Sequence, residues 1–164
     1  MKEFSRRRFV LGTASVAAAG ALAGCSGNGN GNGNGNGNGN GEPDTPEGRA
    51  DAFLTDMDAG GYDGMVDETG QDEIVIACGA GPNGYQYDPA GVIVDAGTTV
   101  VWEWTGEGGN HNVVSTVESD FEFESDLTDE AGFTFEHTFD EEGAGTYECE
   151  PHRAQGMYGA VVVE

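Results

Sequence analysis

Positive charge is what this chain lacks most. Its 164 residues include six lysines and arginines against 30 aspartates and glutamates, and its single lysine is Lys2. After residue 24, 29 acidic residues stand against Arg49 and Arg153 alone, a net charge of about −27. Such a surface repels polyanions, so we expect no nucleic-acid partner and no direct attraction to anionic lipid. Because molar salt shortens the Debye length to ~3 Å, this composition indicates adaptation to very salty surroundings.

Cysteine is scarce as well, and no apolar run is long enough to span a bilayer. The three cysteines are too few for a disulfide framework. The longest apolar stretch, which ends at Ala23, has about 14 residues against the roughly 20 that a spanning helix needs. A wholly disordered acidic chain is disfavoured, because two tryptophans, eight phenylalanines and several valine-rich segments can form a core.

The first residues have the pattern of an export signal. Ser5, three consecutive arginines, Phe9 and an apolar run read as a twin-arginine signal peptide covering residues 1–24. Leu22-Ala23-Gly24-Cys25 matches a lipobox, in which Cys25 becomes the lipid-modified first residue after cleavage. The alternative is a chance cysteine in an Ala/Gly-rich cleavage region, since such motifs are short.

Residues 25–47 read as a lipidated N-terminus and a flexible linker. Glycine and asparagine alternate from Gly27 to Asn40 without an apolar residue, so nothing offsets the entropy of ordering this stretch. A Gly-rich chain of this length reaches on the order of 20 Å. We therefore expect residues 48–164 to form one domain, lipid-anchored to the outer face of the cell membrane.

A cluster of soft ligand types near the end of the chain points to copper. Cys149, His152 and Met157 fall within nine residues, and His111 lies 38 residues upstream of the cysteine. Two histidines, one cysteine and a weak axial methionine are the ligand set of blue-copper centres. Pro151 and Gly156 force a loop, which would present all three later ligands at one end of a sheet.

Each ligand has a simpler interpretation. Cys149 could be a core thiol, His152 a surface histidine after a turn, and Met157 a core gap-filler. His111 could be an exposed histidine in a glycine-rich turn. The remaining histidine, His137, alternates with three phenylalanines and is expected at the edge of the core. Cys78 shares the alternating face of two isoleucines and is expected to be a buried, unpaired thiol.

The domain reads as all-β. Residues 50–57 carry apolar side chains with helical spacing, and short strand patterns separated by Gly-, Pro- and Asp-rich turns follow. The expected strands are Ile74–Cys78, Val92–Val94, Thr99–Trp104, His111–Val114, Phe121–Phe123, Phe133–Phe139, Thr146–Cys149 and Gly159–Val163. Several short strands at close spacing predict a β-sandwich or barrel.

These motifs resemble those of the halocyanins, small blue copper proteins similar to plastocyanin and amicyanin. The resemblance rests on the segment from Tyr147 to Val163, on Gly-Gly-Asn-His111-Asn112-Val-Val and on Val-Val-Trp102-Glu-Trp104, and it runs from about Ala50 to Glu164. It implies a Greek-key cupredoxin sandwich of about seven to eight strands. It also implies that Asn112 bridges the two ligand loops, although a simple turn asparagine is the alternative.

The expected function is one-electron transfer by one copper ion in a membrane-anchored, extracytoplasmic carrier, and not catalysis. Further histidine clusters or a second ligand cysteine, which copper oxidases need, are missing from the sequence. Copper storage or delivery, or a metal-free binding module, are the alternatives. We expect a monomer that docks with redox proteins or membrane respiratory complexes near His152.

Overall fold

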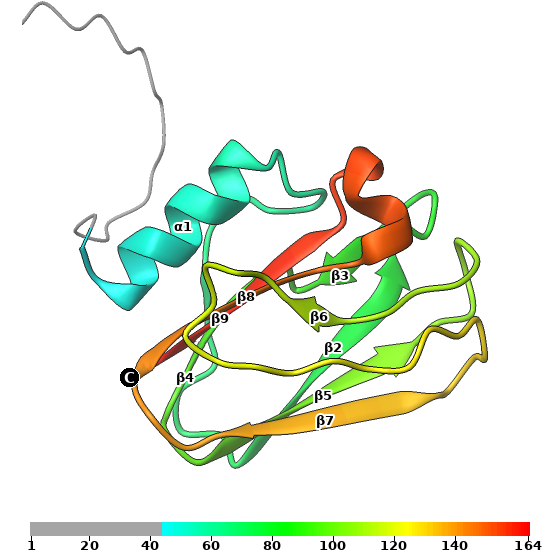
Figure 1. The fold of residues 1–164 in the computed structure, drawn as a ribbon. Helices are drawn as coiled ribbons and strands as arrows, with labels where there is room; N and C mark the ends of the chain where they lie inside the picture. Colours follow the sequence, from blue (N-terminus) through cyan, green and yellow to red (C-terminus); the bar gives the residue numbers. More distant parts are fainter. Residues whose placement is uncertain (1–43) are drawn as a thin grey trace, which may run out of the picture. The chain divides into compact units, whose positions relative to one another are not determined.

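Two β-sheets packed face to face make up the folded part of the chain, which is described here from a computed structural model (Figure 1). The structure describes residues 44–164, so the predicted signal, lipobox and most of the predicted linker lie outside the described residues. One sheet has the strand order β1-β4-β9-β8-β6 and the other β3-β2-β5-β7. The strands are β1 (Val66–Asp67), β2 (Glu73–Ala80), β3 (Gln86–Asp88), β4 (Gly91–Val94), β5 (Thr98–Trp104), β6 (Val114–Ser115), β7 (Thr134–Phe139), β8 (Gly143–Glu148) and β9 (Tyr158–Val163).

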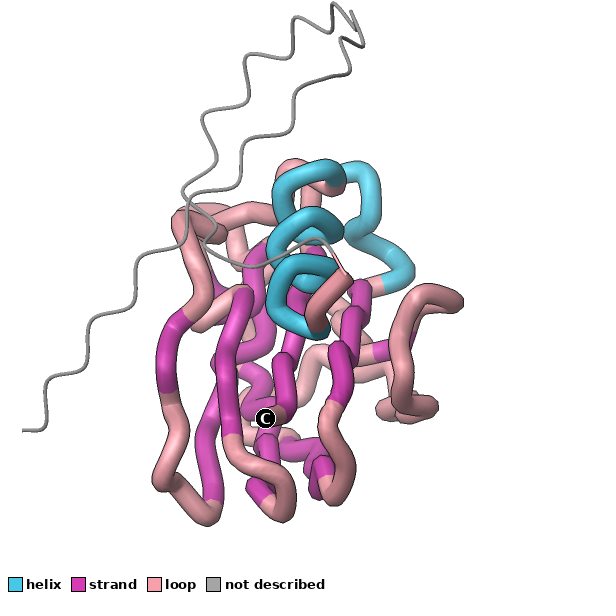
Figure 2. The backbone as a smooth tube through the Cα atoms, turned by 90° about the vertical axis from the view of Figure 1, so that its left-hand side faces the viewer, coloured by secondary structure: helices cyan, strands magenta, loops and turns pink. Residues whose placement is uncertain are grey.

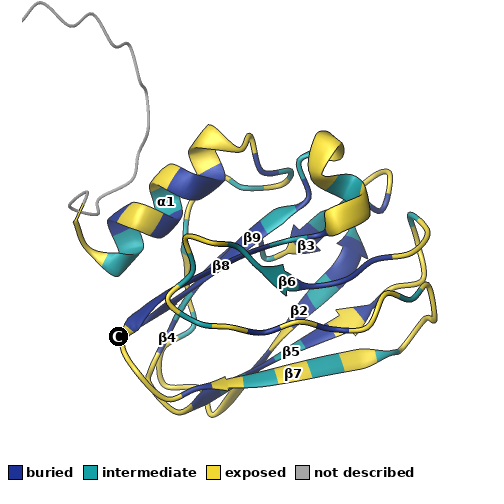
Figure 3. Cartoon of the chain, in the orientation of Figure 1, coloured by how far each residue is buried: buried dark blue, intermediate teal, exposed yellow. Residues whose placement is uncertain are grey.

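The core lies between the two sheets, where the inner faces of the strands meet (Figure 3). Strand β2 buries Ile74, Ile76 and Cys78 in alternation, as the sequence predicted. Trp102 and Trp104 lie on the buried face of the neighbouring β5. An all-β sandwich is therefore confirmed, with nine strands among residues 44–164 against the predicted seven to eight.

Helix α1 (Pro46–Asp56) covers the outer side of the sheet that contains β8 and β9 (Figure 2). Its first turn is capped by Thr45, whose hydroxyl accepts a hydrogen bond from the Gly48 N–H, and Pro46 suits the first helical position. These signals explain why the helix begins four residues before the predicted Ala50. Within residues 44–164, no helix is long and apolar enough to cross a membrane.

Two predicted strands are wrong in part. Of the predicted strand His111–Val114, only Val114 lies in a strand, β6, which continues to Ser115. The predicted strand Phe121–Phe123 is not formed. The Ser125 hydroxyl accepts from the Val113 N–H and the Ser115 hydroxyl from the Phe123 N–H, so side chains replace ladder bonds there. The predicted loop after Cys149 is a 3₁₀ helix, η1 (Glu150–Gln155), and the short strands β1 and β3 were not predicted.

His137 lies at the edge of the core, as predicted. Its ring is half-buried on β7 and packs against Phe123 and Phe139, with ring centroids 5.1 and 4.7 Å away. It is not part of the histidine and cysteine cluster described below.

The charge distribution makes folding dependent on salt. Among residues 44–164, no aspartate or glutamate is buried, so the acidic side chains repel one another through solvent. We expect the melting temperature of the domain to rise steadily as NaCl is raised from 0.01 to 1 M, where the Debye length falls from ~30 to ~3 Å. Differential scanning calorimetry checks this, and a melting temperature independent of salt would contradict it.

Candidate metal centre

The loop from β8 to β9 brings three of the predicted ligands together. Cys149 directly follows β8 and precedes η1, His152 lies within η1, and Gly156 ends that helix in the left-handed conformation. The Met157 N–H donates to the His152 carbonyl (3.2 Å), and the Cys149 N–H donates to the Met157 carbonyl (3.0 Å). The loop is therefore closed on itself by its own backbone, which fixes the spacing of its side chains.

His111 reaches the same place from the segment that precedes β6. Its backbone exchanges two hydrogen bonds with Thr128, of 2.9 and 3.1 Å, in an isolated antiparallel bridge. The Trp104 indole N–H also donates to the His111 carbonyl (3.2 Å). These contacts hold the histidine, which is fully buried, at the end of the sandwich where the Cys149 loop lies.

Three donor atoms converge there. The Cys149 Sγ lies 3.6 Å from His111 Nδ1 and 3.4 Å from His152 Nδ1, and the two Nδ1 atoms are 3.1 Å apart. Among residues 44–164, these side chains form one cluster whose ligand atoms all lie within 4.8 Å of one another. The structure thus brings together residues from two segments that are 38 positions apart in sequence.

A hydrogen bond determines which nitrogen of His111 faces the cluster. His111 Nε2 lies 2.7 Å from the Glu107 carbonyl oxygen. Because a carbonyl can only accept, Nε2 carries the proton, and Nδ1 of the neutral ring presents a lone pair to Cys149. Gly79 makes room for this contact, since a Cβ there would lie 2.7 Å from that oxygen and 3.1 Å from Nε2.

In the metal-free protein, burial is the main influence on the pKa values of the three clustered side chains. It raises the pKa of the Cys149 thiol to about 11, against backbone hydrogen bonds from Asn112 and His152 that lower it. Burial also lowers the pKa of His111, although the bond to Glu107 opposes this. The pKa of His152 is lowered by burial and by the neighbouring His111. Both imidazoles are therefore neutral at pH 7 and can act as ligands.

Met157 and Asn112 are two further predicted site residues near the cluster in sequence or by hydrogen bond. The Met157 side chain is fully buried in the same core as Cys149. Asn112 donates from Nδ2 to a Glu150 carboxylate oxygen (2.8 Å) and accepts at Oδ1 from the Glu150 N–H (3.0 Å). This amide joins the segment of His111 to the segment of Cys149, which is the bridge that the resemblance implied.

Sequence reasoning missed several residues around the cluster. Tyr85 packs against the His152 ring with centroids 4.6 Å apart, and the Tyr87 hydroxyl donates to the Asn112 carbonyl (2.6 Å). The Glu107 contact uses a backbone oxygen, which any residue type supplies. No pattern in the sequence indicates these three contacts.

The residues present fit copper. The two imidazole nitrogens and the thiol sulfur face a common point, and the bare Nδ1 of His111 needs a proton or a metal ion as its partner. Two imidazoles and one cysteine sulfur, of which only His152 is partly exposed, with a buried methionine at the end of the same loop, define the class of mononuclear copper proteins with a mixed nitrogen and sulfur site.

Comparisons with known proteins agree with this class. The sequence model of copper-binding proteins of the plastocyanin/azurin family matches residues 74–164. A halocyanin from Natronomonas pharaonis is 73% identical over 165 residues, covering 100% of both chains. A plastocyanin from Scenedesmus fuscus is 28% identical over 99 residues, covering 56% of this chain and 100% of the plastocyanin. Among solved structures, a Cu(I) amicyanin variant is 27% identical, with a TM-score of 0.48, over 59% of this chain and 87% of the amicyanin.

The chain therefore belongs to the plastocyanin/azurin family of copper-binding proteins and, by its full-length match, to the halocyanins. It is a blue copper electron carrier and not an enzyme, and its cofactor is copper. The resemblance identified from the sequence is confirmed.

Copper affinity should depend on pH through the thiol. A thiolate must form before Cys149 can bind a metal, so protons compete with copper up to the pKa of about 11. We expect Cu(I) affinity to rise about tenfold per pH unit between roughly pH 7.5 and 9.5, with one proton released per copper bound. Competition against a chelator of known pH dependence measures this. Affinity that stops rising above about pH 8.5, the pKa of an ordinary thiol, would contradict the buried thiol.

The hydrogen bonds between Asn112 and Glu150 should increase the affinity of the site for copper. Asn112→Ala removes both bonds to Glu150, so the two ligand segments can separate more easily. We expect copper affinity to fall about 10- to 100-fold, as is typical when partners behind the ligands are removed. Asn83→Ala, the same change in an exposed loop, is the matched control. Equal affinities for both variants would mean that Asn112 is a turn residue only.

Proposed function

We propose that His111, Cys149, His152 and Met157 hold the copper ion, with Met157 as the weak axial donor. The observation that carries this proposal is the convergence of three ligand atoms within 4.8 Å at the buried end of the sandwich. Bound there, copper supplies a one-electron couple between Cu(I) and Cu(II).

The chain contributes rigidity and exclusion of water. His111, Cys149 and Met157 are each fully buried, and their backbones are tied to Thr128 or to the closed ligand loop. A cage held in this way changes little when its metal changes charge, which favours fast electron transfer. Because these three side chains have no solvent-exposed surface, little room remains for a substrate.

His152 is the proposed route for electrons. It is the one member of the cluster that is partly exposed, and it lies against Tyr85 at the surface. Partners would be redox proteins or membrane respiratory complexes that dock around this ring. In high salt, long-range steering is screened, so short-range apolar and shape contacts would determine docking.

Location follows from the N-terminal segments. The twin-arginine pattern, the lipobox at Cys25 and the Gly-Asn linker support export and lipid anchoring on the outer membrane face. The acidic surface supports a highly saline environment. A monomer tethered by its lipid is the simplest arrangement of the chain. The proposed parts are a signal over residues 1–24, a linker over residues 25–47 and the copper domain over residues 48–164.

Reduction potentials test the role of Met157. Met157→Leu should retain copper and colour, because the cysteine and two histidines supply the strong bonds. Losing the axial sulfur destabilises Cu(II) relative to Cu(I), so the potential should rise by roughly 60 mV or more, about tenfold in the equilibrium. Met157→Gln offers a harder oxygen and should lower it. Voltammetry that finds equal potentials in all three forms would make Met157 a packing residue.

Membrane attachment is tested at Cys25. Cys25→Ser removes the sulfur that would carry the lipid, so the protein should move from the membrane fraction into the medium. Fractionation and mass spectrometry of the mature N-terminus measure this. Cys78→Val, which changes a buried thiol of the domain, is the control and should remain with the membrane. An unmodified Cys25 at the mature N-terminus of the wild-type protein would contradict the proposed lipid anchor.

A further inference from the structure

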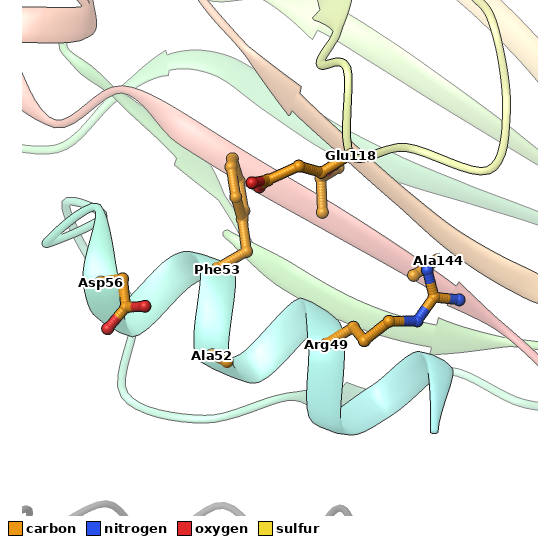
Figure 4. Close-up of a pocket in the computed structure, with 7 residues that line it drawn as sticks. Arg49, Ala52, Phe53, Asp56, Glu118 and Ala144 are labelled. Carbon is orange, nitrogen blue, oxygen red and sulfur yellow. The ribbon is translucent and has the colours of Figure 1, made fainter. Parts of the chain in front are cut away.

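The helix α1 lies outside the part of the chain that the copper-binding family shares. The family model begins at residue 74, whereas α1 and the turn after it occupy residues 46–61. This segment is nevertheless well packed. Ala50, Phe53 and Leu54 are buried against the outer face of β8 and β9, and the Phe53 ring meets the Tyr158 ring edge-on at 5.7 Å. Figure 4 shows Phe53 and Arg49 projecting from the helix on the side that faces Glu118 and Ala144.

The turn that ends α1 is shaped to meet the ligand loop. Helix-end hydrogen bonds from Met57 to Phe53 (3.0 Å) and from Ala59 to Leu54 (2.9 Å) tighten the chain, and Asp58 adopts a positive φ of 50°. Non-glycine residues rarely adopt that conformation, so the surrounding packing must hold it. The tight turn directs the Gly60 N–H away from its own helix.

That N–H binds the residue next to Met157. Gly60 donates to the Gly156 carbonyl at 2.8 Å. The two turns touch backbone to backbone, because a Cβ on Gly156 would lie only 2.7 Å from the Asp58 carbonyl oxygen. The Gly156 carbonyl oxygen also accepts a hydrogen bond from the Tyr158 N–H (3.0 Å). The residues on either side of Met157 are therefore joined to each other as well as to Gly60.

The remaining backbone bonds of Met157 stay within the ligand loop. Its N–H donates to His152 and its carbonyl accepts from Cys149. Among the backbone hydrogen bonds of the described residues, Gly60 therefore supplies the contact that ties the Gly156–Met157 peptide to a different part of the fold. An axial thioether bond is weak and long, so the position of its sulfur depends on the backbone rather than on the metal.

We propose that the turn after α1 is a positioning brace, in which the Gly60 N–H holds Gly156 and thereby sets the position of the Met157 side chain. The brace depends on Met157 being the axial donor, which is part of the proposed function. Releasing Gly156 lets Met157 withdraw from the cluster. The reduction potential then moves upward, toward the value of a site without an axial sulfur.

Substitution of Gly60 tests the brace. Gly60→Pro removes the N–H, whereas Gly60→Ala keeps it and adds a Cβ 3.0 Å from the flexible Gln86 side chain. In full-length, copper-loaded protein, we expect Gly60→Pro to raise the potential part of the way toward that of Met157→Leu. Gly60→Ala should stay close to wild type. In a Met157→Leu background, Gly60→Pro should add no further shift, because no axial sulfur is left to move.

The outcomes separate the brace from the axial ligand. If Met157→Leu shifts the potential and Gly60→Pro does not, the brace is wrong and the axial role stands. An equal shift from Gly60→Pro in both backgrounds also overturns the brace, because Gly60 would then act through another group. If Met157→Leu leaves the potential unchanged, the axial role fails and the brace fails with it.

A second variant and a metal-free readout cover the case in which Gly60→Pro does not fold. Phe53→Ala weakens the packing of α1 on the sheet while every residue from Cys149 to Met157 stays unchanged, and it should raise the potential. Val75→Ala, at an exposed position on β2, should not. In metal-free protein, the Gly60 amide should exchange slowly with solvent in wild type and faster in Phe53→Ala. Fast exchange in wild type, or equal potentials in the two alanine variants, would overturn the brace.

Discussion

The hydrogen bond between His111 Nε2 and the Glu107 carbonyl oxygen is the contact on which the site depends. It fixes the proton on one side of the ring and leaves the other nitrogen facing Cys149, before any metal arrives. The bond exists because Gly79 has no side chain to separate the two groups. The Thr128 bridge and the Trp104 indole then hold the backbone of His111 so that the ring cannot turn away.

The acidic residues and the ligand residues differ in their exposure to solvent. All acidic side chains of residues 44–164 reach solvent, whereas Cys149 and Met157 are fully buried in the apolar core and the His111 ring is fully buried at its end. Salt therefore governs the stability of the domain through its surface, and burial governs the chemistry of the cluster through the pKa of Cys149. The two effects meet at Glu148 and Glu150, whose charges add to the burial that raises the pKa of the Cys149 thiol.

Sequence reasoning succeeded where chemistry or alternation is local. Cys149, His152 and Met157 lie in one short loop, so their ligand types could be read together, and the strands of the core follow from alternating apolar residues such as Ile74, Ile76 and Cys78. It failed where backbone groups act at a distance. A backbone carbonyl like that of Glu107 is present in every residue type, and an N–H like that of Gly60 in every type except proline, so neither leaves a mark in the sequence. The serine hydroxyls that shorten β6 compete with the sheet only in the folded chain.

The proposed copper site is made by one cysteine thiolate and two histidines that the fold holds together. The visible absorption spectrum of the oxidised full-length protein tests it most directly, with Cys149→Ser as the comparison. We expect one copper per chain and an intense thiolate-to-Cu(II) charge-transfer band that Cys149→Ser lacks. Bound copper without that band in the wild type, or the same band in Cys149→Ser, would contradict it.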